Sequence, residues 1–91
     1  MDKIFFIDGH NFNDLVQFFE AIGSQLIEDN NSGKNWNAFN DILYGGFIKT
    51  EYEEPFTLIW KNSDFSMKVL EDFNDIVDLI NSHEHIKLIL D

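Results

Sequence analysis

Three short runs of apolar residues constrain the fold of this chain more than any other feature. They are Ile4 to Ile7, Phe56 to Trp60 and Ile86 to Leu90. Runs of this length and composition favour β-strands that are covered by helices. The connections between them are long enough for crossovers, so we expect the strands to pair in parallel with right-handed crossovers.

Apolar residues at helical spacing predict about four helices in these connections. The first begins after a cap at Asn13 and the second after a cap at Asn35. The expected helices span residues 15–26, 36–44, 64–70 and 72–81. This alternation predicts an α/β fold, with a three-stranded parallel sheet packed against about four helices.

Length and composition indicate one domain, residues 1–91, with room for a single core. Hydrophobic residues make up 44% of the chain and include ten Phe and two Trp, which supply that core. Cysteine is absent, so neither disulfides nor thiolate metal sites hold the fold together. Its stability must therefore come from packing.

The charge of the chain restricts its partners. Seventeen acidic residues against six basic ones give a net charge of -11, which argues against direct binding of nucleic acid or of an anionic membrane. For an acidic domain such a charge most often serves solubility, and the more specific alternative is a strongly basic partner protein whose encounter the field would accelerate. The first apolar run is far shorter than the ~20 residues that cross a bilayer, so we expect a cytoplasmic protein without a signal peptide.

The expected helix at residues 36–44 has two chemically different faces. Trp36, Phe39 and Leu43 form an apolar stripe that we expect to be buried. The opposite face carries hydrogen-bonding groups and no cation: Asn37, Asn40, Asp41 and Tyr44. Gly45 and Gly46 should end the helix, which leaves Asp41 at the unfavourable negative end of the helix dipole. Such a polar face suits either an ordinary surface helix or a binding site.

Motifs for metal, cofactor or catalytic sites are weak. Residues 28–33 resemble the start of a calcium loop, but Glu28 and Phe39 occupy positions that need Asp and Glu. His83 and His85 are two residues apart, which does not suit a zinc-binding helix. Gly-x-Ser-x-Gly and a glycine-rich phosphate loop are both missing. The sequence therefore predicts no enzyme, no metal site and no cofactor.

Two segments resemble a known family. GKNWNAFND at residues 33–41 resembles the signature Gly-x-Asn-[Leu/Trp]-[Asp/Asn]-Ala-[Leu/Phe]-x-Asp of barstar-like ribonuclease inhibitors. PFTLIW at residues 55–60 resembles their second strand, and the similarity extends from Lys3 to Leu90. The resemblance implies a barstar-like α/β fold and a protein that inhibits a basic secreted or toxin ribonuclease, in a complex expected to be 1:1. The free protein is expected to be monomeric.

The family resemblance also assigns roles to individual residues. It implies that the second helix and the loop before it cover the nuclease active site, where Asp41 takes the place of an RNA phosphate. Asn37 matches a neighbouring acidic position, and Asp78 matches an acidic position on the last helix. The complete set of expected partner contacts is Asn31, Asn37, Asn40, Asp41, Tyr44, Gly45, Phe47 and Asp78.

This sequence departs from the best-known family member at several of these positions. Asn40 replaces tryptophan, Tyr44 replaces threonine, and Asn31 replaces a tyrosine that fills the enzyme cleft. The loop at residues 45–54 is longer and resembles a Gly-Gly-Phe branch of the family. We therefore expect a different cognate nuclease, with Phe47 or Tyr52 as a replacement aromatic contact.

Three other functions fit the same observations. The protein could be an immunity protein of this fold that neutralises a different basic nuclease toxin. It could be a non-inhibitory acidic module that binds a basic protein. A small hydrolase or metal enzyme built around His10, His83 and nearby carboxylates is the third alternative, although no catalytic spacing supports it.

Overall fold

The strands of the computed structural model follow the three apolar runs. The structure describes residues 3–26, 35–45 and 51–91. The strands are β1 (Lys3–Asp8), β2 (Phe56–Lys61) and β3 (Ile86–Leu90), each within a residue of the expected bounds. They form one parallel sheet in the order β1-β2-β3, with β2 in the centre. The α/β fold with a three-stranded parallel sheet is thereby confirmed.

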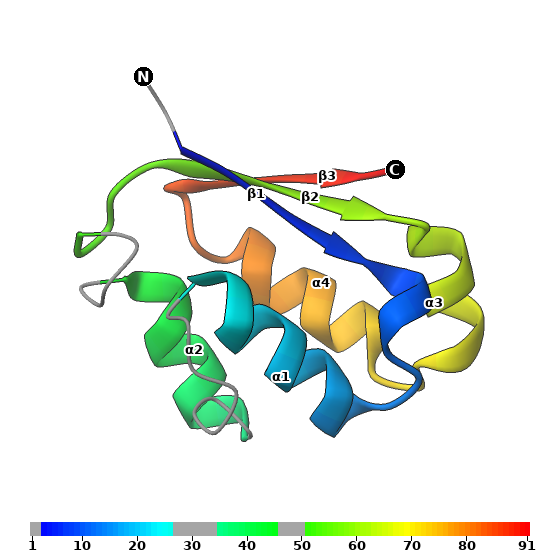
Figure 1. The fold of residues 1–91 in the computed structure, drawn as a ribbon. Helices are drawn as coiled ribbons and strands as arrows, with labels where there is room; N and C mark the ends of the chain where they lie inside the picture. Colours follow the sequence, from blue (N-terminus) through cyan, green and yellow to red (C-terminus); the bar gives the residue numbers. More distant parts are fainter. Residues whose placement is uncertain (1–2, 27–34, 46–50) are drawn as a thin grey trace.

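Four α-helices lie within the described residues, as expected. They are α1 (Leu15–Leu26), α2 (Trp36–Tyr44), α3 (Ser63–Val69) and α4 (Phe73–Asn81). A short 3-10 helix that the sequence did not suggest, η1 (Gly9–Asn11), follows β1. Helices α1, α2 and α4 lie on one side of the sheet, and α3 lies at the end where the strands finish (Figure 1). The opposite side of the sheet faces away from these helices.

One of the two predicted helix caps is confirmed. Asn35 caps α2, because its Oδ1 accepts a hydrogen bond from the amide of Ala38 at 2.8 Å. The cap expected at Asn13 is wrong. Asp14 accepts from the amide of Gln17 at 2.8 Å, and the Gln17 side chain accepts from the amide of Asn13 at 2.7 Å. Asp14 takes this role because α1 begins at Leu15, so Asp14 is the residue directly before the helix and its carboxylate can accept from an amide of the first turn.

Aromatic side chains form the centre of the core. Trp60 of β2 is fully buried and stacks on Phe18 of α1, with ring centroids 5.2 Å apart. It also contacts Phe12 before α1 and Phe73 of α4, at 5.9 and 5.0 Å. Phe39 of α2 joins the cluster by packing edge-on against Phe18 at 5.4 Å. One indole ring thus connects the sheet with the helices that cover it.

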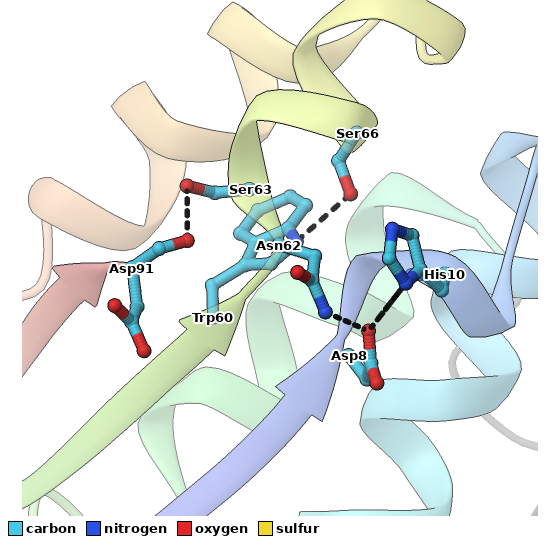
Figure 2. Close-up of polar contacts among 7 residues, drawn as sticks. All are labelled: Asp8, His10, Trp60, Asn62, Ser63, Ser66 and Asp91. Carbon is cyan, nitrogen blue, oxygen red and sulfur yellow. Dashed lines mark hydrogen bonds and ion pairs between the residues drawn. The ribbon is translucent and has the colours of Figure 1, made fainter.

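Polar contacts fasten the carboxyl ends of the strands (Figure 2). Trp60 Nε1 donates to Ser66 Oγ of α3 at 3.0 Å. Asn62 donates to the carboxylate of Asp8 at 2.8 Å, which ties the end of β1 to the turn after β2. Ser63 Oγ donates to the carbonyl of Asp91 at 3.1 Å. The polar residues at this edge of the sheet are therefore used to hold the fold.

Replacing Gly45 with alanine should destabilise the protein. Gly45 ends α2 with φ 87° and ψ -155°, a combination that is essentially restricted to glycine, and its amide donates to the carbonyl of Ile42. We expect Gly45→Ala to lower the free energy of unfolding by about 1–3 kcal/mol, measured by urea denaturation. Ser24→Ala, at an exposed position of α1, is the control and should leave stability nearly unchanged. Equal stability of the two variants would show that the backbone at Gly45 does not require glycine.

Candidate functional site

Helix α2 places its polar and apolar residues on different faces. Phe39, Ile42 and Leu43 are buried against the core, whereas Asn37 and Asp41 are exposed. The amphipathic pattern predicted for this segment is thus present. Helix α2 lies on the same side of the sheet as α1 and α4 (Figure 1), and its exposed residues are accessible to a partner.

Asp41 is the exposed carboxylate at the start of the last helical turn of α2. Within the part of the chain that the structure describes, its side chain forms no hydrogen bond or ion pair. The negative end of the helix dipole opposes its charge. No cation from residues 3–26, 35–45 or 51–91 pairs with it, so among these residues the carboxylate is available to an external donor.

Trp36 differs from the sequence prediction. Its place in the apolar stripe predicts burial, but 37% of its surface is exposed. Its ring packs edge-on against Phe19 of α1, with centroids 5.6 Å apart. Trp36 occupies the first turn of α2, at the margin of the core, so α1 covers one side of the indole and the other side faces a groove.

The groove next to Trp36 runs between α2 and α4 and has a volume of about 470 Å³. Its lining residues are Trp36, Asn37, Asn40, Asp72, Asp75 and Leu79. Its described lining therefore combines two carboxylates, two amides and the apolar surfaces of Trp36 and Leu79, and contains no cation. Asp78 is exposed one turn beyond Asp75 on α4 and does not line the groove.

Two histidines between α4 and β3 hold the end of α2. His83 is buried and its Nε2 lies 2.7 Å from Asn40 Oδ1, while His85 Nε2 lies 2.7 Å from the carbonyl of Leu43. Both oxygens can only accept, so each imidazole donates from Nε2. His85 thus satisfies an orphan carbonyl of the helix end. Asn40 uses its oxygen internally, which leaves its amide nitrogen to contact a partner.

A tyrosine pair continues the site beyond the end of α2. Tyr44 is half-buried and its ring stacks on that of Tyr52, with centroids 5.7 Å apart and planes 11° apart. The Glu53 amide donates to the Tyr44 carbonyl at 2.6 Å, and Lys3 pairs with Glu54 at 3.1 Å. These contacts fix a turn that leaves Tyr52 67% exposed.

Other residues of interest are not brought together. Asn31, Phe47 and the calcium-like segment 28–33 lie outside the described residues. His10 follows the end of β1 and His83 precedes the start of β3. Because the strands are parallel, the two histidines lie at opposite ends of the strands. Among residues 3–26, 35–45 and 51–91, no three His, Asp or Glu side chains are grouped as metal ligands. The same ranges contain no helix that is long and apolar enough to cross a membrane.

Sequence reasoning missed the role of the histidines and most of the α4 side of the groove. Asp72, Asp75 and Leu79 share one face of α4, which helical spacing reveals. Spacing does not show that this face meets α2. His83 and His85 follow α4 in the sequence, but they contact the end of α2.

Fold and surface define a class of protein: a small α/β domain that presents carboxylates, amides and aromatic rings on one helical face. The chain matches the family model for Barstar (barnase inhibitor) over residues 3–86, so it belongs to that family. Members of this family bind and inhibit a ribonuclease and are not enzymes. A search of curated proteins finds no match.

Stability should fall in mild acid because of His83. Burial first, and then the neighbouring His85, lower the pKa of His83, although Glu53 acts in the opposite direction. The unfolded chain therefore binds a proton at His83 more readily, so the stability present above pH ~6.5 is lost as the pH falls through the lower folded pKa. Urea denaturation between pH 8 and pH 5 should show this decrease.

Two variants test the assignment. His83→Gln should flatten the pH dependence, whereas Ser24→Ala, at an exposed position that carries no titratable group, should leave it unchanged. A pH dependence that persists in His83→Gln would show that another group is responsible.

Proposed function

We propose that this protein inhibits a basic ribonuclease by placing α2 across the enzyme active site, with Asp41 in the position of an RNA phosphate. Family membership supports a ribonuclease as the partner. The observation that carries the mechanism is the exposed carboxylate of Asp41. Ribonucleases bind a polyanion through Lys, Arg and His, and these donors can form charge-assisted hydrogen bonds with a carboxylate.

A carboxylate on a helix suits this role energetically. The backbone of α2 is fixed by the Asn35 cap, by Phe39 in the core and by the His85 bond to Leu43. Little conformational freedom is therefore lost when the partner binds. Once the interface excludes water, the paired charges are desolvated, which is typical of a binding hot spot.

Neighbouring groups supply the rest of the proposed contact surface. Asn37 and Asn40 line the α2 side of the groove between α2 and α4. Gly45 allows the chain to turn sharply there, and Tyr52 offers the aromatic surface that Asn31 and Asn40 do not provide. Asp78, with Asp72 and Asp75, adds negative charge on α4. Asn31 and Phe47 remain predicted contacts.

Long-range attraction supports the same partner. A net charge of -11 should accelerate encounter with a basic enzyme and make the rate of association depend on salt. The proposed setting is cytoplasmic immunity, in which a monomer binds one nuclease molecule and protects the cell. The cognate enzyme can equally be another basic nuclease toxin.

Removing the charge of Asp41 should abolish tight inhibition. A panel of secreted basic ribonucleases, barnase among them, is titrated with the protein, and RNA cleavage is measured. Loss of a hot spot costs at least about 2 kcal/mol, or roughly 30-fold in affinity, a threshold drawn from measured interfaces that include barnase–barstar and not from this structure. Asp41→Asn should therefore raise the inhibition constant at least about 30-fold.

Asp64→Asn is the matched control, because Asp64 is an exposed acid on α3. It should inhibit about as well as the parent protein. If Asp41→Asn inhibits equally well, Asp41 is not the phosphate substitute. If the parent inhibits no nuclease in the panel but binds one of them, the protein is a non-inhibitory binding module.

The acids of α4 should act mainly on the association rate. Asp75→Asn combined with Asp78→Asn removes two exposed charges. We expect slower association at low salt, a smaller salt dependence and a nearly unchanged dissociation rate, measured by stopped-flow mixing with the inhibited ribonuclease. A change confined to dissociation would instead place these carboxylates within the desolvated contact.

A further inference from the structure

The face of the sheet opposite the helices has its own chemistry. This outer face is the side of the sheet that α1, α2 and α4 do not cover (Figure 1), and it consists of alternate residues along the three strands. Its members are Ile4, Phe6, Asp8, Thr57, Ile59, Lys61, Lys87, Ile89 and, just after β3, Asp91. The ammonium group of Lys61 lies 5.5 Å from the ring centroid of Phe6, which confirms that both side chains share this face.

Apolar residues occupy the middle of the outer face. Phe6, Ile59 and Ile89 are aligned across the three strands by the parallel register. Phe6 is 47% exposed and Ile89 is 38% exposed, and Ile4, one pair earlier, is 55% exposed. These residues therefore form one continuous apolar row across all three strands.

Charge is distributed unevenly along the outer face. Among the described residues, its amino end carries Lys87 beside Thr57 and Ile4, for a local charge of about +1. Its carboxyl end carries Asp8, Lys61 and Asp91, for a local charge of about -1. The outer face is therefore close to neutral in a molecule whose net charge is -11. Two copies can meet at this face with the acidic helices pointing away from each other.

We infer that the outer face binds a second copy of this chain in a weak two-fold dimer, with the sheets stacked and their strands antiparallel. In this arrangement the symmetry axis crosses the strands at the Phe6, Ile59 and Ile89 positions, and each of these residues faces its own copy. Lys87 of one protomer then lies opposite Asp91 of its partner, and this pair occurs twice. The positive end of each outer face therefore lies opposite the negative end of its partner's outer face.

The alternative stacking, with parallel strands, is disfavoured by the same charges. It would place the two positive ends together and the two negative ends together. Apolar contact between sheets about 10 Å apart is common to both arrangements, so electrostatics decides between them. Charge complementarity within a single face is what makes a second copy the favoured occupant.

The size of the outer face sets the strength of the dimer. Three strands of five or six residues give a face roughly 15 Å across and roughly 17 Å long. Such a face buries less than the ~800 Å² per partner of a standard stable interface. The dimer should therefore form at high protein concentration and separate on dilution. The nuclease-binding surface on α2 lies on the other side of the sheet and remains open in the dimer.

Sedimentation velocity of the whole protein tests the dimer from about 10 µM to about 1 mM, the range expected for a small interface. The average mass should rise toward twice the monomer mass. Phe6→Lys and Ile89→Lys should each raise the dissociation constant at least about tenfold, because each buries a charge among apolar groups. A mass that stays monomeric at about 1 mM would overturn the proposal.

Two further comparisons make the test specific. Met67→Lys is the matched control, because Met67 is 59% exposed on α3 and lies outside the outer face. It should dimerise like the parent protein, and circular dichroism should show that every variant is folded. Lys87→Asp should weaken the dimer, and adding Asp91→Lys should restore it. The antiparallel arrangement is wrong if Phe6→Lys dimerises as strongly as the parent protein. It is also wrong if adding Asp91→Lys to Lys87→Asp does not restore dimerisation.

Discussion

The burial of Trp60 is the interaction on which the rest of the structure depends. Its indole ring lies on the central strand, stacks on Phe18 of α1, packs against Phe73 of α4 and donates a hydrogen bond to Ser66 of α3. A buried indole must satisfy its N–H, and Ser66 does so without disturbing the apolar contacts. The sheet, two core helices and the turn after β2 are thus positioned by one side chain.

The candidate binding helix is attached to this core indirectly. Phe39 connects α2 to Phe18, while His83 and His85 fasten its last turn through polar contacts. The position of Asp41 therefore depends on aromatic packing at one side of the helix and on hydrogen bonds from two imidazoles at its end. A protein that presents one carboxylate accurately needs both kinds of support, because α2 is only nine residues long.

Sequence reasoning predicted the strands and helices well, because each apolar run and each helical spacing has a direct physical meaning. The first helix cap shows the limit of sequence reasoning. Asn13 was predicted, but Asp14 forms the cap, and both residue types can accept the same hydrogen bond. The exposed face of α2 was also predictable from spacing. The groove with α4 was not, because local patterns do not show which helix faces meet. The hydrogen bond between His83 and Asn40 was not predictable for the same reason, because the two residues are 43 positions apart in the sequence.

The all-parallel order of the sheet has a consequence for how the chain folds. Pairing of β1 with β2 joins segments separated by α1 and α2, and pairing of β2 with β3 joins segments separated by α3 and α4. No hairpin among these strands can form early and locally, so the entropy of closing long loops opposes the first contacts. We therefore expect this domain to fold more slowly than a helical bundle of its length, with the sheet and its helices forming together.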